Sequence, residues 1–166
     1  QADVEFFRSV PASGGPLKFL YNNPATRKGY SGTAILTRHE ALCVYKNFEG
    51  WPALTDQNVP AEMLTEGRVL TAEYPTYYVV TTYTPNSKPD LARLPDRQIW
   101  DNAWRAYLQW LESTGKKVIA CGDLNVAHTD LDIHSPKGRA HAAGFTMEER
   151  TGFSRLVQEA GFVDTF

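Results

Sequence analysis

A change of hydrophobic period between residues 95 and 121 constrains the fold more than any other feature of this sequence. Residues 95–114 carry apolar side chains at steps of three and four, Pro95 suits a first helical turn, and Gly115 suits a C-terminal stop. Residues 117–121 then form a short apolar run, which predicts a strand. A long helix that leads directly into a strand indicates an α/β fold. The residues that share the helix face are Trp100, Ala103, Trp104, Tyr107, Leu108 and Leu111.

Other patterns extend this prediction along the chain. The tryptophans Trp100 and Trp104 are at core spacing, which favours packing over base stacking. Thr146 and Glu149 have the spacing of a capping box, which predicts a helix closed by Gly161. Together these elements indicate one α/β unit with layered sheets and outer helices. The remaining predictions are a short helix at 2–10, strands at 18–21 and 32–37, connecting structure at 50–65, an antiparallel pair at 67–74 and 77–84, and a polar loop at 127–144.

Composition bounds the class of protein. A chain of 166 residues can bury one core, so we expect a single domain over 1–166. The net charge of −2 excludes a globally basic protein, although a local basic face can still meet a polyanion. Cys43 and Cys121 lie far apart, and Cys121 is expected to be a small buried thiol, which favours a reduced, intracellular protein. Neither a membrane span nor a secretion signal is expected, and both chain ends are expected to be cut.

An acid and an amide follow the predicted strand in the sequence Val118–His128. Polar groups just past the carboxyl end of a strand are held firmly while they face a crevice. Asp123 and Asn125 are therefore the first candidate functional residues. The alternative is that Gly122 and Asp123 only form a turn, with Asp123 capping nearby backbone N–H groups.

A second polar run, Thr82–Ser87, also follows an apolar strand. The phenol of Tyr83 and the amide of Asn86 can donate hydrogen bonds to an anionic oxygen, which makes them candidate phosphate contacts. The alternative is a simple turn at 85–87 with Tyr83 on a packed strand face.

The segment 127–144 holds the remaining candidates. His128 is either a metal ligand or a packed residue. Lys137, Arg139 and His141 form an acid-free cluster that either contacts a phosphate backbone or is merely solvated. Oxygen and amide ligands beside phosphate-binding donors suit Mg²⁺-assisted chemistry on a phosphate ester better than zinc chemistry.

With these residues assembled, the chain resembles the exonuclease III type of AP endonuclease, within the endonuclease/exonuclease/phosphatase superfamily. The Gly-Asp-Leu-Asn motif specifies only the superfamily, whereas the Tyr-Ser-Gly, Tyr-Thr-Pro-Asn-Ser and Ala-Gly-Phe-Thr segments select the DNA-repair branch. The matching segments are Gly29–Leu36, Glu66–Val69, Tyr83–Ser87, Arg93–Leu94, Arg97–Asp101, Cys121–His128, Asp132, Pro136–Gly138 and Ala143–Arg150.

This resemblance implies part of a DNase I-like, two-sheet α/β sandwich with outer helices. It implies cleavage of double-stranded DNA on the 5′ side of abasic sites, with 3′-phosphodiesterase or 3′→5′ exonuclease activity as well. Asp123 would orient or deprotonate the attacking water, and Asn125 would stabilise charge on the phosphoryl group. Tyr83 would contact the scissile phosphate and Asn86 the DNA backbone. Asp123 and Asn125 would also help to bind Mg²⁺, or Mn²⁺ in its place.

The chain also departs from the family pattern. Family members have an N-terminal strand ending in Asn, a Gln-Glu pair with the principal metal-binding carboxylate, a pocket-shaping Asp and a Ser-Asp-His motif, and none of these is found here. Lys88 and Pro89 replace a common Gly or Arg, and Ser135 and Arg139 stand where two DNA-contacting Asn residues are common. Ser135, Lys137 and Arg139 remain the expected DNA contacts.

Three functional hypotheses follow. The leading one is a central part of an AP endonuclease, inactive alone and partnered by the missing segments of its own fold. Its compartment would be nuclear or mitochondrial in a eukaryote and cytoplasmic in a bacterium, without a membrane. The second is a catalytically dead nucleic-acid-binding or structural homologue, and the third is a superfamily phosphatase for a small or lipid substrate. Retention of Tyr83, Asp123 and Asn125 favours the first.

Overall fold

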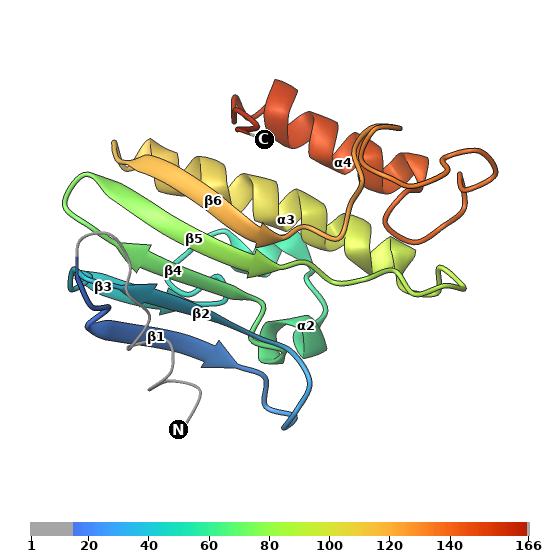
Figure 1. Ribbon diagram of the computed structural model, residues 1–166. Helices are drawn as coiled ribbons and strands as arrows, with labels where there is room; N and C mark the ends of the chain where they lie inside the picture. Colours follow the sequence, from blue (N-terminus) through green and yellow to red (C-terminus); the bar gives the residue numbers. More distant parts are fainter. Residues whose placement is uncertain (1–14, 166) are drawn as a thin grey trace.

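The computed structural model describes residues 15–165, and the helix expected at residues 2–10 lies outside this range. An α/β arrangement is confirmed, with strands and helices alternating over the second half of the chain (Figure 1). In chain order the elements are β1 (Phe19–Pro24), β2 (Gly32–Thr37), β3 (Cys43–Lys46), the 3₁₀ helix η1 (Leu54–Gln57), α2 (Ala61–Thr65), β4 (Val69–Glu73), β5 (Tyr77–Tyr83), α3 (Leu94–Ser113), β6 (Lys117–Asp123) and α4 (Met147–Gln158).

The described strands form two sheets. β1 and β2 make an antiparallel two-stranded sheet, and the second sheet has four strands in the order β3-β4-β5-β6. The predicted pairing of residues 67–74 with 77–84 is confirmed, because β4 and β5 are antiparallel neighbours. Helix α3 follows β5 in the sequence and leads into β6, which pairs with β5 in parallel. The carboxyl ends of β5 and β6 therefore meet at one edge.

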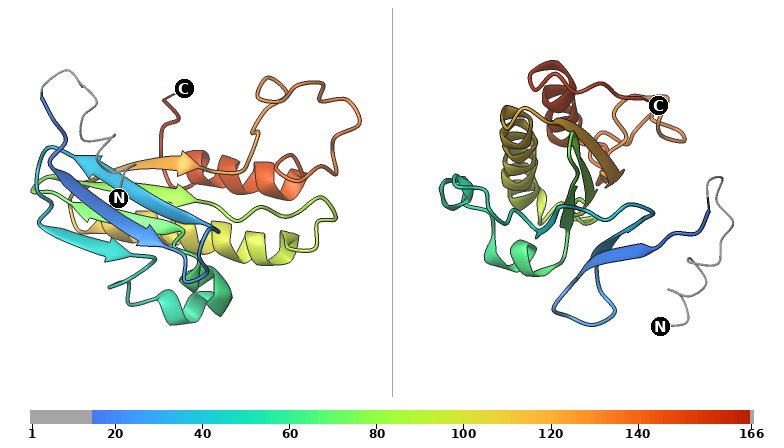
Figure 2. Two further views of the ribbon diagram at one scale, coloured as in Figure 1. Left: turned by 60° about the horizontal axis from the view of Figure 1, so that its bottom comes forward. Right: turned by 90° about the vertical axis from the view of Figure 1, so that its left-hand side faces the viewer.

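Two apolar layers hold these elements together. The larger core lies between the four-stranded sheet and α3, where Val80, Trp100 and Leu108 are fully buried. The smaller core joins Ile35 of β2 to Leu70 and other residues on the opposite face of the same sheet. Figure 2 shows this order: α3 lies on one side of the green strands and the β1–β2 pair on the other. The two described sheets are therefore layered, with helices outside.

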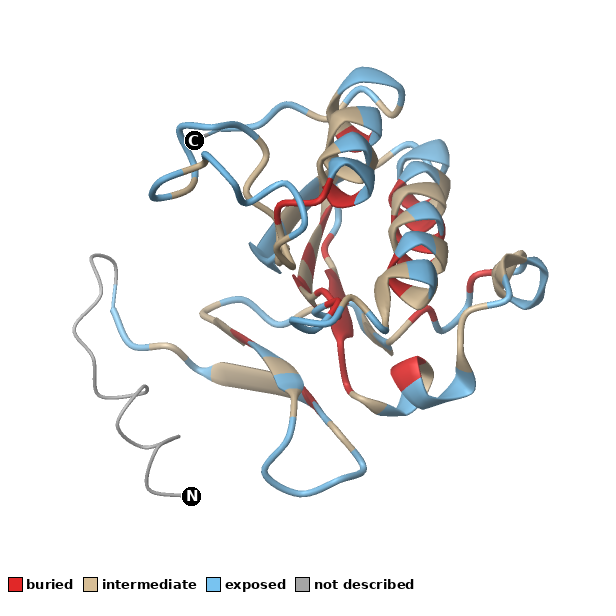
Figure 3. Cartoon of the chain, turned by 90° about the vertical axis from the view of Figure 1, so that its right-hand side faces the viewer, coloured by how far each residue is buried: buried red, intermediate tan, exposed pale blue. Residues whose placement is uncertain are grey.

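The long helix α3 is the main element of the larger core. Its bounds agree with the prediction to within one residue, and every residue predicted to share its inner face is buried. Figure 3 shows this buried face turned toward the strands while the opposite face is exposed. The rings of Trp100 and Tyr107 pack within 5.1 and 5.2 Å of the Phe48 ring. The tryptophans are packing residues, as the period predicted.

The capping box of α4 is also confirmed. The hydroxyl of Thr146 accepts from the backbone N–H of Glu149, and the Glu149 carboxylate accepts from the N–H of Thr146. Regular helical structure ends at Gln158, and Gly161 follows with a φ of 75°. This reciprocal cap satisfies backbone donors that the start of a helix otherwise leaves unpaired.

Two predictions were wrong, and one strand was not predicted. Residues 43–46 form strand β3, which was not expected, and the segment 50–65 contains η1 and α2. These elements are only four and five residues long, too short for a hydrophobic period to develop. Cys121 is exposed rather than buried. It lies with Ile119 on the face of β6 turned away from the larger core, and among residues 15–165 β6 has a sheet neighbour only in β5.

No helix within residues 15–165 combines the length and apolar character needed to cross a bilayer.

Candidate active site

Two polar segments come together where β5 and β6 end, and we call residues 83–87 and 122–125 the site rim. Tyr83 and Asp123 are register partners at the last step of the parallel pair. The backbone N–H of Thr84 then donates to the Asp123 carbonyl at 2.9 Å. Strand β6 runs two residues further than predicted, so Asp123 is its final residue. The sheet itself therefore fixes the spacing between the phenol and the carboxylate.

Gly122 is required where β6 approaches β5. Its φ is 124°, and a Cβ built on it would lie 2.0 Å from the carbonyl oxygen of Thr82. Only glycine adopts this backbone conformation without strain and leaves room for the neighbouring strand. The sequence Gly122–Asp123 is thus a constraint on the strand end, and the carboxylate that follows it is exposed to solvent.

The two amides of the rim are held by hydrogen bonds. Asn125 donates through Nδ2 to the Thr84 carbonyl at 2.8 Å, and its Oδ1 accepts from Asn86 Nδ2 at 3.2 Å. Asn86 Oδ1 in turn accepts from the backbone N–H of Lys88 at 2.8 Å. The N–H of Asn125 donates to Asp123 Oδ1 at 2.9 Å, with Asn125 in the left-handed region at φ 47°. The rim residues thus orient one another across the two strands.

Tyr83 is positioned from the other side by Arg68. The backbone N–H of Tyr83 donates to the Arg68 carbonyl at 2.8 Å, and the side chain of Arg68 donates through Nη1 to the Tyr83 carbonyl at 2.8 Å. The guanidinium also lies 5.0 Å from the centre of the Tyr83 ring, a cation–π arrangement. Within residues 15–165 the Tyr83 hydroxyl has no hydrogen-bond partner, so it can donate to a bound group.

An open cleft of about 340 Å³ lies beside the rim, and the carboxylates of Asp123, Asp132 and Asp164 line it. Hydrogen bonds from the backbone N–H and hydroxyl of Thr129 lower the pKa of Asp132. In the described part of the chain, no three His, Cys, Asp or Glu side chains are grouped closely enough to hold a metal ion. The site therefore offers one rim carboxylate rather than a closed metal cage.

His128 also lines this cleft, but its ring is held by contacts with α4. Its Nε2 lies 2.8 Å from the Ser154 hydroxyl, and its ring packs 4.8 Å from that of Phe153. Of the two sequence interpretations, these contacts favour the packed residue over the metal ligand.

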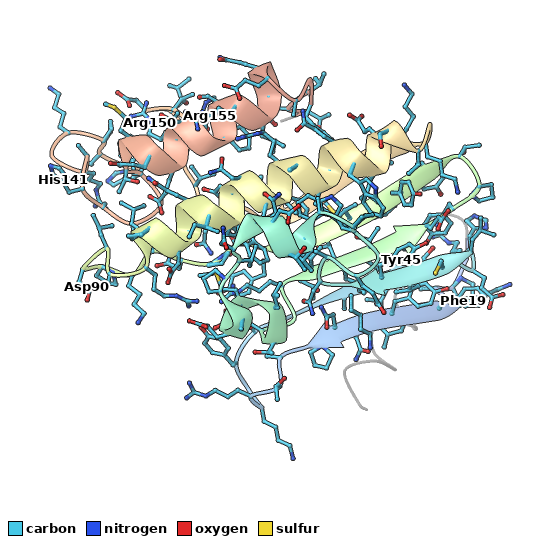
Figure 4. All side chains as sticks on the ribbon, turned by 180° about the vertical axis from the view of Figure 1, so that it is seen from behind. Phe19, Tyr45, Asp90, His141, Arg150 and Arg155 are labelled. Carbon is cyan, nitrogen blue, oxygen red and sulfur yellow. The ribbon has the colours of Figure 1, made fainter. Side chains whose placement is uncertain are left out.

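The predicted DNA contacts Ser135, Lys137 and Arg139 all lie exposed on the 127–144 loop. This loop projects from the same end of the molecule as the ends of β5 and β6 (Figure 1). His141 of the loop also lies at the same end as Asp90, which follows β5 (Figure 4). The structure thus brings the loop to the side of the molecule that carries the rim, but gives no contact between the two sets of side chains.

No role at the site was predicted from the sequence for three buried charged residues behind the rim, Arg68, Arg97 and Glu149, which are 3%, 2% and 1% exposed. A signal existed for Arg97, because it stands three and seven residues before Trp100 and Trp104 on the inner face of α3. Beside it, burial raises the pKa of Asp101 to about 6, although Arg97 opposes the shift. Charged side chains are rarely buried unless they are paired.

The rim can therefore act on a bound anion. It presents an exposed carboxylate able to hold a water or a cation, and two oriented amides and a phenol able to donate hydrogen bonds. Such preorganised donors stabilise charge that develops on a reacting oxygen.

Comparison with known proteins gives concordant matches. A model of the "Endonuclease/Exonuclease/phosphatase family" matches residues 2–164. The chain is 45% identical to the "DNA repair nuclease APEX1" of Danio rerio over 140 residues, covering 84% of this chain and 41% of that protein. It is 42% identical to an "Exodeoxyribonuclease" of Bacillus subtilis over 147 residues, covering 89% of this chain and 54% of that protein.

A solved structure is similar as well. The AP endonuclease LMAP from Leishmania major superposes with a TM-score of 0.70 and 29% identity, over 88% of this chain and 50% of that one. The chain therefore spans about half the length of the relatives that it matches.

Proposed function

Because the chain belongs to the endonuclease/exonuclease/phosphatase family, we propose that the complete natural polypeptide is a DNA repair phosphodiesterase that cleaves duplex DNA 5′ to abasic sites. A 3′-phosphodiesterase or 3′→5′ exonuclease activity at the same site is part of this proposal. The observation that carries it is the meeting of Tyr83, Asn86, Asp123 and Asn125 at one sheet edge. The names of the matched nucleases support DNA as the substrate.

Each rim residue has a role that its contacts support. Asp123 would orient or deprotonate the attacking water, because its carboxylate is exposed and held by the Asn125 N–H. Asn125 donates one Nδ2 hydrogen to the Thr84 carbonyl, and its second Nδ2 hydrogen would stabilise charge on the phosphoryl oxygen. The unpartnered Tyr83 hydroxyl would contact the scissile phosphate, and Asn86 would help to position the DNA backbone.

The donor set is compatible with Mg²⁺, with Mn²⁺ as a substitute. Mg²⁺ keeps several waters and needs only one or two protein carboxylates, so the single rim carboxylate of Asp123 is a suitable partial site. The side-chain oxygen Oδ1 of Asn125 already accepts from Asn86 Nδ2, which favours the donor role of this amide over metal ligation. When bound, the metal would neutralise phosphate charge and lower the pKa of a bound water. A further carboxylate ligand is expected outside these 166 residues.

The exposed loop supplies the proposed DNA contacts. Lys137 and Arg139 would neutralise backbone phosphates, and the Ser135 hydroxyl would donate to a phosphate oxygen. These contacts position the duplex without reading its sequence. The partner would then be duplex DNA in whichever compartment holds the genome: the nucleus or mitochondrion in a eukaryote, the cytoplasm in a bacterium.

We place the described residues in one domain, part of a DNase I-like sandwich whose other part the matched relatives possess. The chain spans about half of those relatives, so the rest of a similar sequence would supply further strands and site residues. The 166 residues alone are therefore expected to be inactive.

An incision assay on the complete natural polypeptide tests the proposal. The substrate is a duplex with one tetrahydrofuran abasic analogue, incubated with Mg²⁺ or with EDTA. We expect a Mg²⁺-dependent cut on the 5′ side of the analogue and none in an undamaged duplex. DNA binding without any cut would contradict the proposal and support a catalytically dead homologue. Release of phosphate from a small or lipid ester, with no action on DNA, would support a phosphatase instead.

A further inference from the structure

A buried arginine lies directly behind the rim. Arg97 belongs to the first turns of α3, and only 2% of its surface is exposed. Removing a charged guanidinium from water costs on the order of several kcal/mol unless hydrogen bonds and opposite charges satisfy its donors. The acceptors of those donors therefore indicate the role of the buried charge.

Three of the donor contacts reach carbonyl groups of the rim loops. Arg97 Nη1 donates to the Pro85 carbonyl at 3.0 Å and to the Asn125 carbonyl at 3.1 Å. Its Nη2 donates to the Leu124 carbonyl at 2.9 Å. One guanidinium thus contacts both the loop after β5 and the loop after β6.

These carbonyls are directly linked to the proposed active groups. The Pro85 carbonyl lies in the same planar peptide unit as the N–H of Asn86, and the Leu124 carbonyl lies in the same unit as the N–H of Asn125. That second N–H donates to Asp123 Oδ1 at 2.9 Å. Fixing the two carbonyls therefore fixes two backbone planes and, through one of them, the orientation of the carboxylate.

Carboxylates on the other side of Arg97 complete the cluster. Arg97 Nε donates to Asp101 Oδ1 at 2.8 Å, and Nη1 lies 3.7 Å from Glu149 Oε1. Glu149 is itself buried and accepts from the Ser87 hydroxyl at 2.6 Å and from the Gly144 N–H at 2.8 Å. The Arg97–Glu149 pair thus also contacts the end of the 127–144 loop, through the Gly144 N–H.

We propose that Arg97 is a positioning residue that sets the relative placement of the two halves of the rim, Tyr83 and Asn86 on one side and Asp123 and Asn125 on the other. This inference rests on the proposed function for its catalytic consequence. Arginine presents five donors in one rigid plane, whereas lysine has a single ammonium that cannot reach the same carbonyls together. Arg97→Lys therefore keeps the charge and loosens the geometry.

The test compares Arg97→Lys with Leu111→Val in the complete polypeptide, using the abasic duplex and Mg²⁺ under single-turnover conditions. Leu111 is a matched control, since it is equally buried on the same helix but far from the rim. Small displacements of reacting groups can cost about 100-fold in rate. We expect Arg97→Lys to cut about 100-fold more slowly with DNA affinity changed less than threefold, and Leu111→Val to cut at the wild-type rate despite a lower melting temperature. A wild-type cutting rate for Arg97→Lys would overturn the inference.

A second measurement does not depend on cutting. Hydrogen exchange at the backbone N–H of Asn125 reports on the peptide unit that Arg97 holds through the Leu124 carbonyl. We expect this exchange to become at least tenfold faster in Arg97→Lys but not in Leu111→Val. Unchanged exchange in Arg97→Lys would overturn the inference about Arg97, whether or not the wild type cuts DNA. A wild type that cuts no DNA would count against the proposed function alone. If Arg97→Lys does not fold, Asp101→Asn removes one charged partner while keeping the side-chain shape. Wild-type rate and exchange in that variant would contradict the role of the cluster.

Discussion

The site rim and the 127–144 loop share one end of the molecule but are built in opposite ways. The rim amides are cross-linked by hydrogen bonds and supported by buried Arg97 and Glu149. Ser135, Lys137 and Arg139 are exposed on a loop without regular structure. The difference fits two kinds of task. Chemistry on a phosphate needs atoms held in place, whereas contact with a uniform phosphate backbone tolerates side chains that adjust.

The largest effect should come from the rim carboxylate. Asp123→Asn in the complete polypeptide is expected to lower the single-turnover cutting rate about 10³-fold, because a positioned base and metal ligand is lost. Asp130→Asn makes the same chemical change outside the rim, on a side chain that is 69% exposed, and should cut normally. Equal cutting rates for Asp123→Asn and the wild type would show that Asp123 takes no part in the reaction. Gel-shift assays in EDTA check that both variants still bind DNA.

A second prediction concerns the buried support of the rim. Because burial raises the Asp101 pKa to about 6 from an ordinary 3.8, the folded state holds this proton more tightly than the unfolded state. Its contribution to stability is present below about pH 4 and is lost as the pH rises to about 6.

Chemical denaturation at several pH values measures this loss. Relative to Asp101→Asn, the free energy of unfolding of the wild type should fall by up to about 3 kcal/mol over that range, at about 1.4 kcal/mol per unit of pKa. A constant difference between the two proteins across this range would contradict the raised pKa.

The smallest effect should come from the loop. Lys137→Ala combined with Arg139→Ala should weaken DNA binding about tenfold and lower the salt slope by about two, since each phosphate contact contributes about one. The cutting rate at saturating DNA should stay within about twofold, because no reacting group moves. Lys117→Ala with Arg155→Ala removes the same charge away from the loop, and fluorescence anisotropy at several salt concentrations compares the two pairs. An unchanged salt slope in the loop variant would show that these side chains do not meet DNA phosphates.

The parts of the fold that sequence could predict are those with a long or doubly specified signal. The helix α3 repeats its apolar face over 20 residues, and the α4 cap is specified by two residues that bond each other. Strand β3 has four residues and no comparable signal. The exposure of Cys121 depends on which face of β6 receives a partner, which an apolar run cannot indicate.

The site divides in the same way. Tyr83, Asn86, Asp123 and Asn125 could be selected because polar residues follow apolar strands, and the parallel register then explains why they meet. The support behind them was indicated only in part, by the spacing of Arg97 from Trp100 and Trp104. A charged residue such as Arg97 is ordinarily assigned to a solvated helix face, and its carbonyl partners carry no side-chain signal in the sequence. Backbone acceptors become visible only when the chain is folded.

A crystal structure of the complete polypeptide with an uncut abasic duplex, held with Ca²⁺ in place of Mg²⁺, would show whether the rim is the active site. We expect the phosphate 5′ to the abasic site to lie within about 3.2 Å of the Tyr83 hydroxyl and of Asn125 Nδ2, as ordinary hydrogen bonds require. A duplex bound on another face, with that phosphate remote from both groups, would contradict the assignment of the rim as the active site.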